Sequence, residues 1–220
     1  MLSCTVLSAQ DTKKPSSSKP ATTKPAPTTK PAAVKEAPAA KPSPPKPEQA
    51  KKASEEDIQR AWQESMTPGP FHEMLARYTG DWKEIVTMWN APGAEPVTME
   101  MNCMIQMIYE GRYQESVHNG TFNGMPFEGR GFMAYDNAAG KFYSTWIDNM
   151  STGIMCTSGT MDPKGQRLEM KGEVVDPITK KVSKIKEVVY FNTDNEQIHE
   201  TYTTPAGGTE YKSMEIRMVR

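Results

Sequence analysis

Apolar and polar residues alternate with a period of two along most of the chain from residue 82 onward. Because successive side chains of a β-strand point to opposite faces, this alternation predicts half-buried strands. The clearest apolar face occupies the odd positions of one run: Met99, Met101, Cys103, Ile105, Met107 and Tyr109. The strand-like runs lie near residues 82–89, 98–109, 112–122, 126–136, 141–150, 153–161, 166–175, 182–192, 196–204 and 209–219.

Turn-forming residues separate these runs, as in Asn123-Gly124, Asp162-Pro163-Lys164-Gly165 and Pro205-Ala206-Gly207-Gly208. Short strands at such regular spacing predict a mainly β protein with an antiparallel meander. An open sheet of about ten strands would leave two long unpaired edges. We therefore expect closure into an up-and-down antiparallel β-barrel, with a β-sandwich as the alternative.

Helical periodicity precedes the strands. Ser54 followed by three acidic residues predicts a helix start, because Ser54 can cap the backbone and acids favour the positive end of the helix dipole. A break at Thr67-Pro68-Gly69-Pro70 separates this helix from a second one. The second carries an apolar stripe and is expected to end at Gly80; the stripe is Phe71, Met74, Leu75 and Tyr78.

Composition divides the chain at residue 53. Residues 1–53 hold 10 of the 18 prolines, no aromatic residue, and a net charge of +7. Such a segment cannot bury enough apolar surface to offset its conformational entropy, so residues 11–53 are expected to be a disordered Lys/Pro/Ala-rich linker. Residues 54–220 carry a net charge of −8 and suit one domain with a core. The acidic domain argues against nucleic acid as a partner.

The first ten residues indicate a compartment. Residues 1–10 form a short apolar run that ends in small residues and resembles a truncated signal segment, so we expect an exported protein. Leu2-Ser3-Cys4 leaves lipid anchoring through Cys4 as a variant of export. The basic linker then either has no specific partner or contacts an anionic envelope polymer or membrane. No run of 18 apolar residues exists, so no transmembrane helix is expected.

Two motifs carry a resemblance to known families. Gly80-Asp81-Trp82 resembles the G-x-W signature of lipocalins and other calycins. The resemblance implies that Trp82 closes one barrel end beneath an arginine of the last strand, with Arg217 as the first candidate and Arg220 as the second.

A second resemblance is more specific. Pro68-Gly69-Pro70-Phe71-His72, Gly124-Met125-Pro126-Phe127-Glu128-Gly129 and the block from Ser144 to Gly153 resemble the family of unknown function called DUF1579. The similarity runs from about residue 66 to residue 219. It implies a β-barrel from a bacterial, often exported family with no established activity.

The leading functional hypothesis is a binding module for a small apolar or amphipathic molecule, without a cofactor. Fifteen of the 16 methionines lie in the domain, where they either line a ligand site or fill an irregular core. Asp148 is expected either to orient the ligand or to accept N–H groups from the Ser151–Gly153 turn. The expected lining is Met99, Met101, Met107, Tyr109, Trp146 and Met150, with Asp148 as the polar group. The alternative is a filled barrel that contacts an envelope partner.

Catalytic and metal-binding signals are weak. The histidines His72, His118 and His199 include no pair with metal-ligand spacing. Cys103 and Cys156 form no CxxC motif and are expected to be buried thiols, with one disulfide between them as the alternative. We therefore assign no catalytic residue and no metal site. An enzyme would need titratable groups that converge on one pocket, and only Asp148 with His118 or His199 offers such a set.

Overall fold

The computed structural model describes residues 53–220. The predictions for the signal segment and for linker residues 11–52 lie outside the described residues. Ten strands follow one another along the described chain: β1 Gly80–Met88, β2 Val97–Ile108, β3 Tyr113–Phe122, β4 Met125–Asp136, β5 Lys141–Asp148, β6 Met155–Met161, β7 Arg167–Val175, β8 Val182–Thr193, β9 Glu196–Thr204 and β10 Tyr211–Val219.

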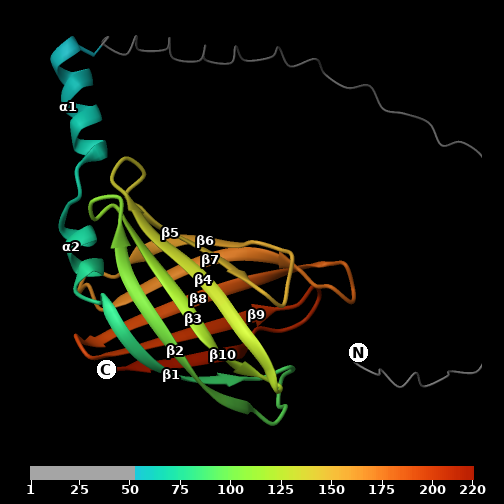
Figure 1. Ribbon diagram of the computed structural model, residues 1–220. Coiled ribbons are helices and arrows are strands. Elements are labelled where there is room, and N and C mark those ends of the chain that lie inside the picture. The colour runs from blue at the N-terminus through green and yellow to red at the C-terminus, as the bar shows by residue number, and fades with distance from the viewer. Residues whose placement is uncertain (1–52) are drawn as a thin grey trace, which may run out of the picture. The chain divides into compact units, whose positions relative to one another are not determined.

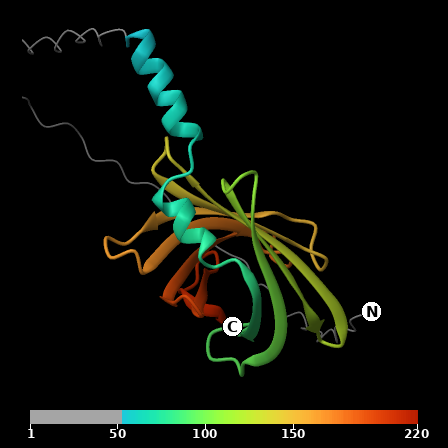
Figure 2. The same cartoon turned by 60° about the vertical axis from the view of Figure 1, so that its left-hand side comes forward.

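The strands form a closed barrel in which each strand pairs antiparallel with its neighbours in sequence, and β1 pairs with β10. Figures 1 and 2 show the strands wrapping around a common axis. This topology confirms the expected up-and-down barrel and replaces the sandwich alternative. Closure pairs the edges that an open sheet would expose.

Two helices precede the barrel. Helix α1, Glu55–Met66, begins where predicted, and the Ser54 side chain accepts a hydrogen bond from the Asp57 backbone N–H. Helix α2, Pro70–Ala76, ends earlier than predicted, because Gly80, at a φ of +117°, begins β1 instead of capping a helix. The buried His72 accepts a hydrogen bond from the Gly69 N–H at the start of α2. Neither helix of the described chain has the length and apolar character needed to cross a membrane.

Helix α2 covers one end of the barrel (Figure 1). The Gln114 side-chain amide donates to the carbonyl of Leu75 at 2.8 Å, which ties α2 to β3. Side chains from α2 and from several strands meet here in a buried cluster that includes Leu75, Trp82, Phe142 and Leu168. This end of the barrel is therefore filled, and we call it the closed end.

The prediction that Arg217 covers Trp82 is wrong, and the second candidate, Arg220, takes that place. Trp82 is 2% exposed and donates its indole N–H to the carbonyl of Tyr78. The guanidinium above the indole belongs to Arg220, 4.5 Å from the ring centre. Arg217 lies on the outer face and pairs with Glu196 at 2.8 Å. The reason is strand parity, because the neighbouring even positions of β10 face the interior.

Candidate functional site

The barrel encloses a cavity of about 330 Å³, which borders the closed-end cluster at residues such as Ile105 and Phe191. Its lining includes Met88 and Phe122, the last residues of β1 and β3, at the end opposite the closed end. The lining also includes Met150, which is 43% exposed, so the cavity reaches solvent at that end. Eight methionines contribute to the wall: Met88, Met101, Met133, Met150, Met155, Met170, Met214 and Met218.

Four of the seven predicted lining residues border this cavity: Met101, Trp146, Asp148 and Met150. Met107 packs against the closed-end cluster instead. Met99 is partly buried and does not border the cavity. Tyr109 is 73% exposed and has a φ of 50°, because β2 ends at Ile108 and the chain has already entered the turn. The assignment of Met99, Met107 and Tyr109 to the cavity lining is therefore wrong.

The position of Trp146 depends on glycine in the neighbouring strand. Gly129 of β4 points toward the indole, and a Cβ atom there would lie 2.4 Å from the Trp146 ring. The absent side chain therefore leaves the space that the indole occupies. The indole stacks with Phe127 at 6.4 Å and contacts the ring of His118 edge-on at 4.9 Å.

Asp148 holds both the indole and the following turn. Its carboxylate accepts hydrogen bonds at 2.9 Å from the Trp146 indole N–H and from the Met150 backbone N–H. A turn-stabilising role was one of the two expectations for Asp148. The donors differ from the expected Ser151–Gly153 N–H groups.

A buried polar row connects β1, β2 and β3 beside the cavity. The Nδ1 atom of His118 lies 3.0 Å from both carboxylate oxygens of Glu84, and its Nε2 atom lies 3.7 Å from the Cys103 sulfur. Nδ1 must carry the proton that a carboxylate accepts, so Nε2 is the acceptor for the Cys103 thiol. Burial, and then the nearby Glu84, raise the pKa of Cys103, which keeps the thiol protonated.

This row is the set in residues 53–220 that offers three metal-ligand atoms in one place. One atom each from Glu84, Cys103 and His118 lies within 4.8 Å of the others. A metal needs the thiolate, and the raised pKa of Cys103 works against it. Cys103 is 2% exposed and does not border the cavity, so the row has the character of a structural network. The other cysteine, Cys156, is exposed, contrary to the expectation of two buried thiols.

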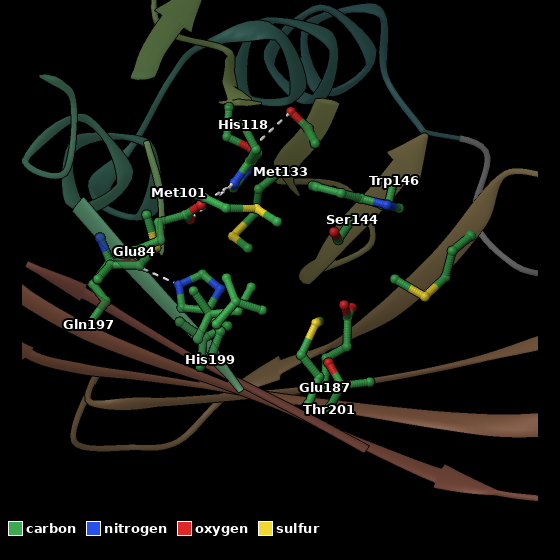
Figure 3. Close-up of a pocket in the computed structure, with 18 of the residues that line it drawn as sticks. Glu84, Met101, His118, Met133, Ser144, Trp146, Glu187, Gln197, His199 and Thr201 are labelled. Atoms are coloured by element: carbon green, nitrogen blue, oxygen red, sulfur yellow. Dashed lines mark hydrogen bonds and ion pairs between the residues drawn. The ribbon is translucent and has the colours of Figure 1, made fainter. Parts of the chain in front are cut away.

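His199 faces the cavity from β9. Its Nε2 atom lies 3.1 Å from the side-chain oxygen of Gln197, so the imidazole donates there and Nδ1 remains an acceptor. Burial, and then the nearby His118, lower the pKa of His199 to about 4, so the ring is neutral at pH 7. The amide nitrogen of Gln197 is buried and has no hydrogen-bond partner within residues 53–220. Figure 3 shows both residues at the cavity.

The second polar side of the cavity contains Glu187. Its carboxylate accepts a hydrogen bond from the Thr157 hydroxyl, and Thr201 is its partner across β8 and β9. Burial raises the pKa of Glu187, although part of its surface is accessible. Because Glu187 borders the cavity, its accessible part faces that space. Figure 3 shows Glu187 beside Thr201. Ser144 and Trp146 lie above them in this view, and Gln197 lies at the left.

Sequence reasoning missed Glu84, Glu187 and Gln197, although a signal existed. Glu84 shares the even positions of β1 with Trp82 and Val86, and Glu187 shares the odd positions of β8 with apolar residues. An acid on an apolar strand face indicates a buried carboxyl group. The expected set of Asp148 with a histidine is not formed: His118 bonds to Glu84, His199 bonds to Gln197, and Asp148 bonds to two N–H donors.

Fold and cavity together define a hollow, ten-stranded up-and-down barrel protein. A family model described as "Protein of unknown function (DUF1579)" matches residues 67–220. The chain belongs to the DUF1579 family, as the motifs indicated.

Solved structures match the chain at low sequence identity. The chain is 12% identical to Rv2717c from M. tuberculosis, with a TM-score of 0.50 over 70% of this chain and 99% of that chain. A redesigned β-barrel matches at 11% identity and a TM-score of 0.36, over 66% of this chain and 93% of that one. No curated protein matches the chain. The Rv2717c likeness speaks to fold alone.

Proposed function

We propose that the protein is a non-enzymatic, lipocalin-like binding protein that holds a small, mostly apolar molecule inside its barrel. The observation that carries this proposal is the cavity of about 330 Å³ inside the barrel. Ligand sites in proteins are apolar concavities of a few hundred Å³ or more with a small number of polar groups. The methionine-rich wall suits this role, because thioether side chains adapt to irregular ligand shapes.

The state of the polar groups favours binding over catalysis. The Cys103 thiol has a raised pKa and no access to the cavity, which makes it a poor nucleophile. Asp148 is occupied by the Trp146 indole and the Met150 N–H. A filled structural barrel is the alternative, and the cavity weighs against it.

Native mass spectrometry after gentle purification, together with thermal shifts on a panel of small amphipathic molecules, tests the proposal. Ser144 borders the cavity, so Ser144→Leu places extra bulk inside it. Ser158 pairs with the exposed Tyr143 on the outer face, so Ser158→Leu is the matched control. We expect a ligand-induced shift in the wild type and in Ser158→Leu that is reduced in Ser144→Leu. No ligand-dependent shift in any protein would contradict the proposal.

We further propose that the protein is bacterial and exported, with a lipid anchor at Cys4 as a variant of export. The support is the apolar stretch of residues 1–10 and the basic, proline-rich residues 11–53, whose net positive charge suits an anionic envelope polymer or membrane. Cell fractionation and mass spectrometry of the mature N-terminus test this placement. An uncleaved, unmodified N-terminus in a cytoplasmic fraction would contradict it.

A further inference from the structure

The acidic residues of the cavity wall differ in how they are neutralised. Four acids contribute to the wall: Glu84, Asp148, Glu187 and Glu200. Glu84 lies against His118, and Asp148 accepts two N–H groups. Glu200 accepts a hydrogen bond from the Lys212 ammonium at 2.7 Å. Glu187 differs from all three, because its one hydrogen-bond donor within residues 53–220 is an uncharged hydroxyl group.

The surroundings of Glu187 do not compensate its charge. Its partners across the neighbouring strands are Met170 and Thr201, which carry no charge. Lys186, the next residue in sequence, points to the outer face and pairs there with Glu210 at 2.5 Å. A carboxylate in an apolar wall is costly unless a positive charge or several donors accompany it. The free side of Glu187 faces the cavity, so a ligand is in position to supply the missing charge.

The rest of the wall accommodates a cation better than an anion. No lysine or arginine borders the cavity within the described residues 53–220. An anionic ligand would therefore be buried without a positive partner. Trp146 and Phe127 contribute aromatic rings, whose faces attract cations, and the methionine sulfurs are polarizable.

We propose that the cavity selects a small organic amine or ammonium ion, whose charged nitrogen pairs with Glu187 while its apolar part contacts the methionine and aromatic wall. This inference rests on the proposed binding function. Glu187 is then a ligand-binding residue. The buried Thr157 holds its carboxylate by a hydrogen bond, and Thr201, which borders the cavity, adds an uncharged hydroxyl group beside the ligand nitrogen.

Three probes of equal chain length separate charge from apolar contact: octylamine, octanol and octanoate. Calorimetric titration of the full chain near neutral pH gives the dissociation constant of each. We expect octylamine to bind about tenfold more tightly than octanoate, because a charge-assisted hydrogen bond is gained with Glu187 and an uncompensated anion is avoided. Octanol is expected to lie between them.

Two variants assign the preference to Glu187. Glu187→Gln keeps the side-chain shape and an acceptor for Thr157, and is expected to weaken octylamine binding about tenfold while octanol binding stays within about twofold. Glu100→Gln removes the same charge from an exposed position of β2 and is expected to match the wild type. Circular dichroism confirms that both variants are folded.

The outcomes distinguish the two levels of the proposal. Binding of octanol and octanoate without a preference for octylamine would overturn the amine inference and leave the binding function standing. Unchanged octylamine affinity in a folded Glu187→Gln would also overturn it. If none of the three probes binds to the folded wild type, the proposed binding function fails and the amine inference fails with it. If Glu187→Gln does not fold, the ratio of octylamine to octanoate affinity in the wild type decides.

Discussion

His199 links the chemistry of the cavity to the stability of the protein. Burial holds the pKa of His199 near 4, whereas an unfolded chain titrates with an ordinary histidine pKa of 6.5. Between these values the unfolded chain binds a proton that the folded protein does not bind. Stability should therefore fall as the pH is lowered from 6.5 toward 4, by up to about 3 kcal/mol from this group.

A comparison with His199→Gln isolates that contribution. Glu187 has a raised pKa and acts in the opposite direction, since the folded protein binds its proton more readily than the unfolded chain does. Because Glu187 and the other titrating groups are common to both proteins, the difference between them reports on His199. Urea unfolding at a series of pH values should show a shallower loss of stability on acidification in His199→Gln. Parallel curves would refute the buried, neutral state of His199.

At the residue scale, the sequence indicates which residues face inward but not which of them meet. Glu84 and His118 are 34 residues apart and contact each other across β2. That contact depends on the register of two strand pairs, which alternation alone does not specify. Trp146 and Asp148 were identified because they share one strand face, whereas Glu187 was missed although the apolar residues around it signal an inward carboxyl.

The backbones of β6 and β7 come close together at Gly159. A Cβ atom at Gly159 would lie 1.8 Å from the carbonyl oxygen of Glu169, which is backbone and cannot rotate away. Gly159→Ala should therefore lower the free energy of unfolding by at least about 2 kcal/mol. Gly153→Ala is the control, because the space around Gly153 is open. Equal unfolding midpoints of the two variants would contradict this close approach.

The end of β10 is joined to the segment between α2 and β1 by Arg220. Besides stacking on Trp82, its guanidinium donates to the backbone carbonyls of Thr79 and Arg77. Arg220→Ala should cost about 1–2 kcal/mol of stability, because a cation–π contact and two hydrogen bonds are lost.

Arg217→Ala is the matched control for Arg220→Ala. It removes one exposed ion pair with Glu196 and should cost less than about 1 kcal/mol. Chemical unfolding of both variants decides between the two arginines. A larger loss in Arg217→Ala would restore the arrangement expected from the sequence.

At the element scale, prediction from sequence is accurate to within a few residues. Period-two alternation and turn residues placed all ten strands, because each strand buries one face and each turn needs permissive residues. The errors are local. Helix α2 ends four residues before Gly80, and β2 stops one residue before Tyr109. Both lie where backbone conformation at a junction, rather than burial, decides the boundary.

At the scale of the whole molecule, the interior of the closed barrel has a filled part and a hollow part, which have different roles. The closed end under α2 holds the buried cluster that includes Leu75 and Trp82, and the cavity extends from this cluster to the opposite end of the barrel. Closure was predictable from the strand count, since ten strands in an open sheet would leave long edges. The division was not, because it depends on side chains such as Trp82 and Trp146 filling space at different levels of the barrel.

Because α2 covers the closed end of the barrel, we expect the barrel to need α2 for its stability and not α1. Helix α1 has no buried residue, and its junction is held by Asn137, which donates to the carbonyls of Glu64 and Thr67. The family match also begins at residue 67. A protein of residues 67–220 should therefore unfold cooperatively, with a stability within about 1 kcal/mol of the full chain and unchanged octylamine binding.

Removal of residues 1–79 is the contrasting truncation. It deletes α2 with Leu75 and Tyr78, which are 0% and 4% exposed, and uncovers the closed end of the barrel. The loss of two large buried side chains should cost several kcal/mol, which a domain of marginal stability does not tolerate. Thermal unfolding followed by circular dichroism compares the two truncations. A cooperative transition in both truncated proteins would show that the barrel folds without α2. Loss of the transition in the protein of residues 67–220 would assign α1 a structural role.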